Sequence, residues 1–175
     1  MEGVACEAAS LAGTLALGNL LYLYDDNHIT IEGDTSLAFR EDVLARFDAL
    51  GWHTQRVNDG NDIEAIDAAI RAAQAEKGKP SLIAVKSIIG YGMPNAGTRK
   101  AHSDAPGAEA VKATKRNLGW PEDAQFLIPD DALAHFRAAV EAGATREADW
   151  NALVDRYEAA HPEKGAQWRR TMSGE

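Results

Sequence analysis

Predicted strands and helices alternate along the first 106 residues of this chain. Three short stretches are predicted as strands: residues 20–24, 52–57 and 82–85. The first and third are apolar runs of the length typical of fully buried parallel strands. Helical spacing predicts helices over residues 2–17, closed by Gly18, over 41–50, and along a buried stripe at Ile63, Ile66, Ile70 and Ala73. The alternation favours an α/β fold, a parallel sheet flanked by helices.

Beyond Gly107 the pattern is helical and contains no further strand. Helices are predicted over residues 109–118, 129–140 and 145–160, with Gly143 closing the second of them, and a turn or two of helix follows Pro162. We therefore divide the chain into an α/β part, residues 1–106, and a mainly helical part, residues 107–175. We expect both parts to belong to one domain over residues 1–175.

Composition excludes several classes of function. The 175 residues are 45% hydrophobic, enough for one domain with a core, and the net charge of −9 gives no basic surface for nucleic acid or anionic membranes. No apolar stretch approaches the roughly 20 residues that span a bilayer. Cys6 stands alone, which excludes an internal disulfide, and we expect it to be a small buried residue. We expect a soluble cytoplasmic protein with no nucleic-acid or membrane partner.

Polar loops follow all three predicted strands, over residues 25–28, 58–62 and 90–106. Ligands bind at the carboxyl edge of open parallel sheets, where such loops meet. Oxygen-rich side chains there suit a hard cation such as magnesium. The same residues also suit ordinary turns and a helix cap, and His102 alone suits an exposed surface position. The residues by themselves therefore predict an α/β domain with a candidate cation or phosphate site, and no reaction.

Two acidic residues near the start also have simple explanations. Glu2 suits the positive beginning of a helix, and Glu7 suits a solvated position. Five residues apart, they lie roughly 140° apart around a helix and share no face.

Residues 24–33, Tyr-Asp-Asp-Asn-His-Ile-Thr-Ile-Glu-Gly, resemble the transketolase version of the second half of the thiamine diphosphate motif, which begins with Gly-Asp-Gly and ends with Asn. Residues 1–13, 79–82 and 88–106 agree with the same family in order, and agreement extends past Trp120. Four spaced segments make this match specific. Deoxyxylulose-phosphate synthases and the thiamine subunits of pyruvate dehydrogenase resemble the family in fold but differ around the asparagine; they remain alternatives, with dihydroxyacetone synthase.

The resemblance implies a thiamine-diphosphate-binding fold and a set of site residues. The Asn27 side-chain oxygen and the Ile29 carbonyl would bind the magnesium ion that holds the diphosphate. His102 would be the catalytic histidine beside cofactor and substrate, and Ile89 would line the cofactor pocket. Glutamates matching Glu2 and Glu7 lie near the family's dimer interface and are linked to communication between its two active sites.

The implied activity is transfer of a two-carbon ketol unit from a ketose phosphate to an aldose phosphate, in the pentose phosphate pathway and by a homodimer. The family's Gly-Asp-Gly, whose aspartate also binds magnesium, would fall just before Met1 and is absent. The resemblance therefore implies that residues 1–175 are an incomplete thiamine-diphosphate-binding domain, and we expect an inactive fragment that needs the remainder of a transketolase chain. The alternative is a non-catalytic module, or one subunit of a split thiamine diphosphate enzyme.

Overall fold

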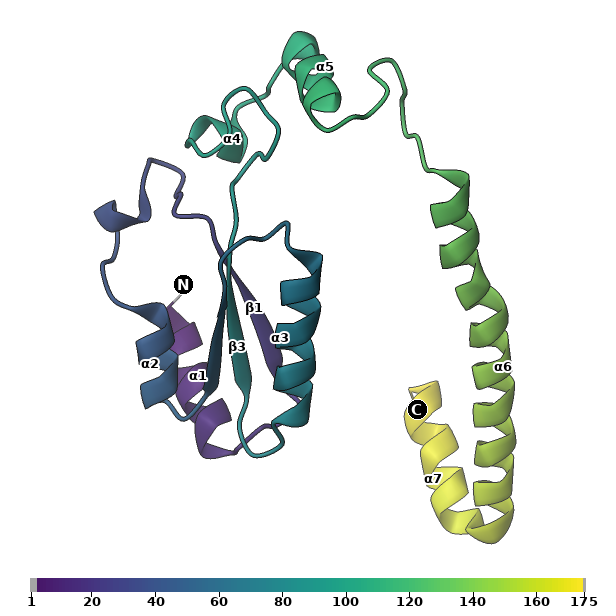
Figure 1. The fold of residues 1–175 in the computed structure, drawn as a ribbon. Coiled ribbons are helices and arrows are strands. Elements are labelled where there is room, and N and C mark those ends of the chain that lie inside the picture. Colours follow the sequence, from purple (N-terminus) through teal and green to yellow (C-terminus); the bar gives the residue numbers. More distant parts are fainter. Residues whose placement is uncertain (1–2, 175) are drawn as a thin grey trace. The chain divides into compact units, whose positions relative to one another are not determined.

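The computed structural model describes residues 3–174, and the chain divides into two compact units, Met1–Asp123 and Ala124–Glu175 (Figure 1). All strands among the described residues belong to the first unit, and the second contains only helices. The predicted α/β fold with a helical C-terminal segment is confirmed. None of the helices within residues 3–174 is both long and apolar enough to cross a bilayer.

A three-stranded parallel sheet forms the centre of the first unit. Its strands are β1 (Leu21–Asp26), β2 (His53–Val57) and β3 (Ser81–Lys86), and their spatial order is β1-β3-β2. Leu21 of β1 and His53 of β2 both align with Ser81 of β3, so the three strands begin at the same level. Their carboxyl ends consequently reach one common edge of the sheet.

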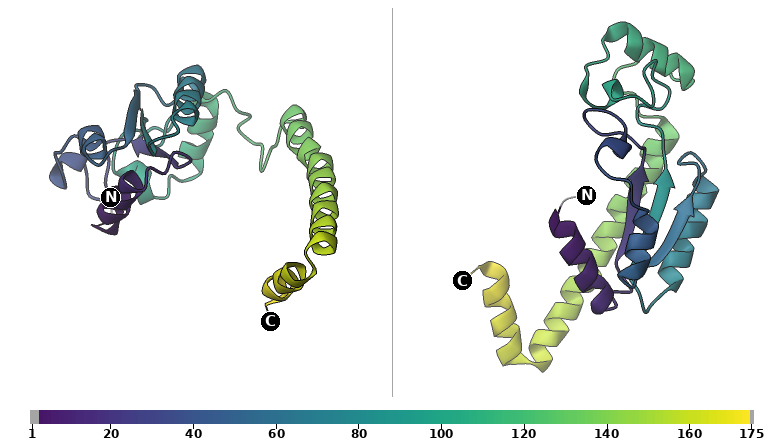
Figure 2. Two further views of the ribbon diagram at one scale, coloured as in Figure 1. Left: turned by 90° about the horizontal axis from the view of Figure 1, so that it is seen from below. Right: turned by 90° about the vertical axis from the view of Figure 1, so that its left-hand side faces the viewer.

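Helices cover both faces of this sheet (Figures 1 and 2). On one face α1 (Gly3–Thr14) and α2 (Val43–Ala49) pack over a core that includes Leu82, and on the other α3 (Ile63–Ala75) packs over a core that includes Ile83. Leu82 and Ile83 point to opposite faces because successive side chains of a strand alternate. The buried run predicted over residues 82–85 is thus the central strand, covered on both faces.

Trp52 contacts both α1 and α2 and packs them against the sheet. Its side chain is 1% exposed, and its indole nitrogen donates a hydrogen bond of 2.8 Å to the Ala9 carbonyl of α1. The Phe47 ring of α2 meets the indole edge to face at a centroid distance of 5.0 Å. A buried indole needs a partner for its N–H, and here the partner is the backbone of the helix that covers it.

The first strand is less buried than its sequence predicts. Tyr22 and Leu23 of β1 are each 54% exposed, so the prediction of a fully buried strand over residues 20–24 was wrong. The reason is the strand order, since β1 lies at an edge and pairs with β3 alone. On the Leu23 face, α3 contacts β2 and β3 and leaves β1 largely uncovered.

Three further details of the first unit differ from the predictions. Helix α1 ends at Thr14, and Gly18 is not its cap: it lies where the chain passes the Lys77 backbone too closely for a side chain. Ile63 is 72% exposed because it is the first residue of α3, directly after the loop. Cys6 is exposed, since the buried residues of α1 are Ala9 and Ala12 in its second half; the thiol instead accepts a hydrogen bond from Arg46.

The described residues of the second unit contain two helices, α6 (Asp130–Ala160) and α7 (Pro162–Ser173). The predicted break at Gly143 was wrong, because α6 runs through it for 31 residues. One glycine costs a helix only about 1 kcal/mol relative to alanine, and the alanines and glutamate beside Gly143 are strong helix formers. Helix α7 has 12 residues and is longer than the turn or two predicted.

The contact of α1 with the end of α2 yields a stability prediction. A methyl group at Gly13 would overlap the Leu50 carbonyl. We predict that Gly13→Ala lowers the free energy of unfolding of the first unit by about 1–3 kcal/mol, the usual cost of overpacking. Urea denaturation followed by circular dichroism measures the loss.

Gly143→Ala is the matched control for this substitution. A methyl at Gly143 meets no atom within 4 Å, so there the alanine should only favour the helix. Equal stability of Gly13→Ala and the unmodified chain would contradict the close packing of α1 against Leu50.

Candidate functional site

The three polar loops predicted from the sequence leave the same edge of the sheet. Asn27 follows β1 directly, residues 58–62 connect β2 to α3, and the loop after β3 leads to His102. Because all pairings are parallel, the expectation that Asn27 and the His102 loop share one sheet edge is confirmed. Asp62 caps α3 by accepting a hydrogen bond of 2.9 Å from the Ala65 amide, as the helix-cap interpretation of its loop predicts.

Asn27 forms a tight turn at the end of β1. Its Oδ1 accepts a hydrogen bond of 2.9 Å from the Ile29 amide, and its Nδ2 donates one of 3.2 Å to Oδ2 of Asp25. His28, which lies between Asn27 and Ile29, has a φ of 60°, the left-handed conformation that turns the chain sharply. The side chain of Asn27 therefore has a fixed place in the turn, held from both sides.

The backbone around Ile29 leaves one oxygen uncommitted. Ile29 and Asp34 form an antiparallel bridge in which the Thr30 amide donates to the Gly33 carbonyl and the Thr35 amide donates to the His28 carbonyl. Among residues 3–174, no hydrogen bond to the Ile29 carbonyl is found. The turn thus offers two neutral oxygen atoms, Asn27 Oδ1 and this carbonyl, of the kind that hard cations bind.

Asp26 beside the turn forms an ion pair with Arg56. It is 9% exposed, its Oδ2 lies 3.1 Å from an Arg56 guanidinium nitrogen, and its Oδ1 lies 3.7 Å from Nδ1 of His28. Through its pair with Arg56, Asp26 connects the end of β1 to β2. Burial raises the pKa of the neighbouring Tyr24 phenol, and the charges of Asp26 and Asp25 raise it further.

The loop after β3 is held at several points. The Ser87 hydroxyl donates to Oδ1 of Asp25, which ties the start of the loop to the end of β1. Ile89 is half-buried, and its carbonyl accepts a hydrogen bond of 2.9 Å from the Gly97 amide. Farther on, Asn117 at the end of α5 (Ala108–Asn117) donates through Nδ2 to the Gly92 carbonyl at 2.8 Å. These contacts give the loop a defined path.

His102 lies within this segment on a short helix, α4 (Lys100–Ser103), and its side chain is exposed. The structure thus brings Asn27, Ile29, Ile89 and His102 to loops of one sheet edge. Glu7 does not join them: it is exposed on α1, and no hydrogen bond or ion pair among the described residues links it to these loops. Glu2 lies outside the described residues.

Sequence reasoning missed the residues that support Asn27. The sequence shows only that Ser87 comes two residues after the apolar run of the central strand and that Asp25 belongs to the polar loop of residues 25–28. Within residues 3–174, no group of three or more His, Cys, Asp or Glu side chains is placed to hold a metal ion. Any cation here would depend on the oxygens of the Asn27 turn.

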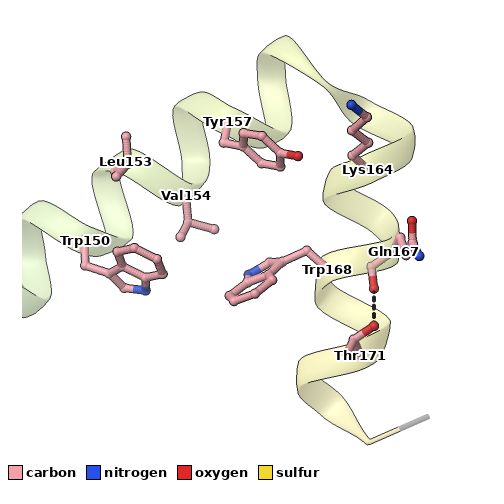
Figure 3. A pocket seen from close by; sticks show the side chains of 8 residues that line it. All are labelled: Trp150, Leu153, Val154, Tyr157, Lys164, Gln167, Trp168 and Thr171. Carbon is pink, nitrogen blue, oxygen red and sulfur yellow. Dashed lines mark hydrogen bonds between the residues drawn. The ribbon is translucent and has the colours of Figure 1, made fainter. Parts of the chain in front are cut away.

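A separate hollow lies within the second unit, between α6 and α7 (Figure 3). Its volume is about 580 Å³, and Trp150 and Trp168 meet there with ring centroids 6.4 Å apart. The lining is mainly apolar: Trp150, Leu153, Val154, Tyr157, Lys164, Gln167, Trp168 and Thr171. Such a surface suits packing, and it lacks the convergent polar groups of a catalytic site.

An open parallel sheet with converging loops at its carboxyl edge defines a ligand-binding α/β domain. The comparisons with known proteins identify which one. A family model described as "Transketolase, thiamine diphosphate binding domain" matches residues 1–175, and the chain belongs to this family of transferases.

Individual relatives agree. The chain is 51% identical to a transketolase of Nostoc sp. over 99% of its own length and 26% of that protein. A Zea mays relative described as chloroplastic is 49% identical over 100% of this chain and 26% of its own. Among solved structures, the crystal structure of Pichia stipitis transketolase in complex with sedoheptulose-7-phosphate matches with a TM-score of 0.89 and 40% sequence identity. This match covers 100% of the present chain and 26% of the Pichia stipitis chain. The chain thus spans about a quarter of the length of these relatives.

Gly90 gives a test of how the loop positions His102. Its φ is +66°, and a Cβ there would lie 2.8 Å from Cβ of Ala101 and 2.9 Å from Sδ of Met93. We predict that Gly90→Ala displaces α4 and costs at least the roughly 1–2 kcal/mol of a left-handed alanine. Amide hydrogen exchange at His102 should then accelerate by about tenfold or more.

Gly119→Ala separates crowding from backbone strain. Gly119 has a φ of +68° in the turn that ends α5, and a Cβ there would meet no atom within 4 Å, so alanine carries the cost of a left-handed residue without a clash. Its exchange rate at His102 should stay near that of the unmodified protein. Equal acceleration in both variants would contradict a specific contact between Gly90 and α4.

Proposed function

We propose that this chain supplies the cation and diphosphate part of a transketolase active centre. The proposed reaction of the whole enzyme is transfer of a two-carbon ketol unit from a ketose phosphate to an aldose phosphate. The observation that carries the proposal is the Asn27 turn, which leaves the Ile29 carbonyl uncommitted at the carboxyl edge of a parallel sheet. The sugar phosphate bound in the Pichia stipitis enzyme supports the substrate class.

The available ligands fit a magnesium ion that is shared with a diphosphate. Asn27 Oδ1 has one hydrogen bond and retains an acceptor site, and the Ile29 carbonyl is free of donors among the described residues. Magnesium prefers oxygen ligands in an octahedron and commonly takes several of them from phosphate. Both protein oxygens are neutral, so the diphosphate and a carboxylate beyond these residues would provide the negative charge. The family's Gly-Asp-Gly aspartate is the expected source.

Other residues would bind and orient the cofactor and substrate. Bound thiamine diphosphate supplies the carbon nucleophile that the breaking and forming of carbon–carbon bonds requires. We assign to Ile89 an apolar wall of the cofactor pocket, and to His102 the donation of a hydrogen bond or proton to a diphosphate or substrate oxygen. An exposed imidazole on a short helix can reach a ligand held above the sheet edge.

We further propose a homodimer acting in the pentose phosphate pathway in the cytoplasm, in contrast to the chloroplastic Zea mays relative. In that assembly Glu2 and Glu7 would contribute to the dimer interface and to communication between the active sites. The exposure of Glu7 on α1 leaves it available for a partner chain.

Substitutions in the full-length enzyme, meaning this chain joined to the segments that its relatives have in addition, test the two main roles. Asn27→Ala should weaken magnesium-dependent binding of thiamine diphosphate by at least about tenfold, because one metal ligand is lost. His102→Ala should mainly lower kcat, by about 10²-fold, as loss of one charge-stabilising donor does. Titrations of cofactor and magnesium against activity separate affinity from turnover.

Asn61→Ala is the matched control, because Asn61 lies in the loop after β2 and forms a similar turn with Asp59. The Asn61 variant should keep both the magnesium-dependent affinity for thiamine diphosphate and the kcat of the unmodified enzyme. Unchanged cofactor affinity in the Asn27 variant would exclude its role as a metal ligand.

The chain alone should show no measurable ketol transfer and only weak affinity for magnesium thiamine diphosphate. Its two neutral oxygens leave the charged part of the octahedron empty. Calorimetry with cofactor and magnesium, beside a coupled assay with xylulose and ribose phosphates, measures both. Micromolar binding or clear turnover would contradict the fragment interpretation; micromolar binding without turnover would favour a cofactor-binding subunit of a split enzyme.

A further inference from the structure

A chain of hydrogen bonds links the central strand to Asn27. The Ser87 hydroxyl, just past β3, donates to Oδ1 of Asp25, and Nδ2 of Asn27 donates to the other oxygen, Oδ2, at 3.2 Å. Asp25 thus uses both carboxylate oxygens to connect two neighbouring loops at the sheet edge. The connection joins residues 62 positions apart in the sequence.

This arrangement selects one of the two orientations of the Asn27 carboxamide. The oxygen and nitrogen of an amide side chain occupy nearly equal volumes, so packing alone does not distinguish them, whereas hydrogen bonding does. The Asp25 carboxylate only accepts hydrogen bonds and therefore takes the amide nitrogen. The Ile29 amide only donates and therefore takes the oxygen. A rotation by 180° would break both bonds and present N–H groups to a cation.

We propose that Asp25 is a positioning residue for the cation site: it holds the Asn27 carboxamide with Oδ1 turned to the ligand side, and Ser87 fixes Asp25 in place. This inference rests on the proposed function, in which Asn27 Oδ1 binds the metal. Asp25 itself is exposed, so burial does not require it to have partners. Its hydrogen bonds at the surface contribute little to global stability, and their main effect is on the orientation of Asn27.

A double-mutant cycle in the full-length enzyme tests this role without measuring activity. Mn²⁺ affinity in the presence of thiamine diphosphate is measured by electron paramagnetic resonance for the unmodified enzyme, Asp25→Ala, Asn27→Ala and the double variant. Asp25→Ala should weaken Mn²⁺ binding by about tenfold or more, as the loss of a hydrogen-bond partner of a metal ligand typically does. In the Asn27→Ala background the same substitution should change the affinity less than about twofold, because its target is gone.

Two more variants separate orientation from charge and from folding. Asp25→Asn keeps an oxygen that can accept from Asn27 but removes the negative charge, and it should restore most of the affinity. Asp59→Ala breaks a similar contact in the loop after β2, where Asp59 accepts a hydrogen bond from Nδ2 of Asn61 at 3.0 Å. It should leave Mn²⁺ affinity unchanged, and all variants should keep a thermal midpoint close to that of the unmodified enzyme.

The outcomes distinguish this inference from the function on which it rests. Equal losses from Asp25→Ala in both backgrounds would overturn it, as would a loss in Asp25→Asn as large as in Asp25→Ala, since either result assigns the effect to charge. Full affinity in Asp25→Ala together with a loss in Asn27→Ala would overturn the inference and leave the proposed function standing. Full affinity in Asn27→Ala would refute both.

Discussion

The parallel pairing of β1 and β2 with the central strand β3 is the constraint on which the site depends. Ile83 and Ala84 of β3 are 0% and 1% exposed, and both neighbouring strands align with the same residue, Ser81. Parallel strands in this register end at one edge, and the loops that leave them meet there. Residues distant in sequence, such as Asn27 and Ser87, become neighbours for this reason alone.

The alternation of strands and helices was predictable because it depends on local pattern, whereas burial and helix length were less so. The runs at 20–24 and 82–85 look alike in sequence, yet the first forms an edge strand and the second the central strand. Strand order decides that difference, and the sequence of a single strand does not determine the strand order. Gly143 resembles a helix end in sequence, but the cost of one glycine is small beside the helix formers around it.

The candidate site, too, was predictable where it depends on local sequence and not where it depends on how the strands pair. A polar residue directly after a strand is a local signal, and the family resemblance adds the identity of the Asn27 turn. The contact of Ser87 with Asp25 required the register of β1 against β3, which the sequence does not state. His102 was expected in a loop after a parallel strand, but the four-residue helix that carries it was not predicted; Ala101 of this helix lies so close to Gly90 that a Cβ there would clash.

Charges around the turn explain why the two oxygens that this chain offers to the proposed cation site are both neutral. The chain has a net charge of −9, yet both carboxylates next to Asn27 have partners: Asp25 accepts from Ser87 and Asn27, and Asp26 pairs with Arg56. The charges of Asp25 and Asp26 therefore stabilise contacts between the strand ends. Two neutral oxygens attract a divalent cation weakly, whereas a diphosphate attracts it strongly. Under the proposed function, metal and cofactor would therefore bind as a unit, each raising the affinity for the other.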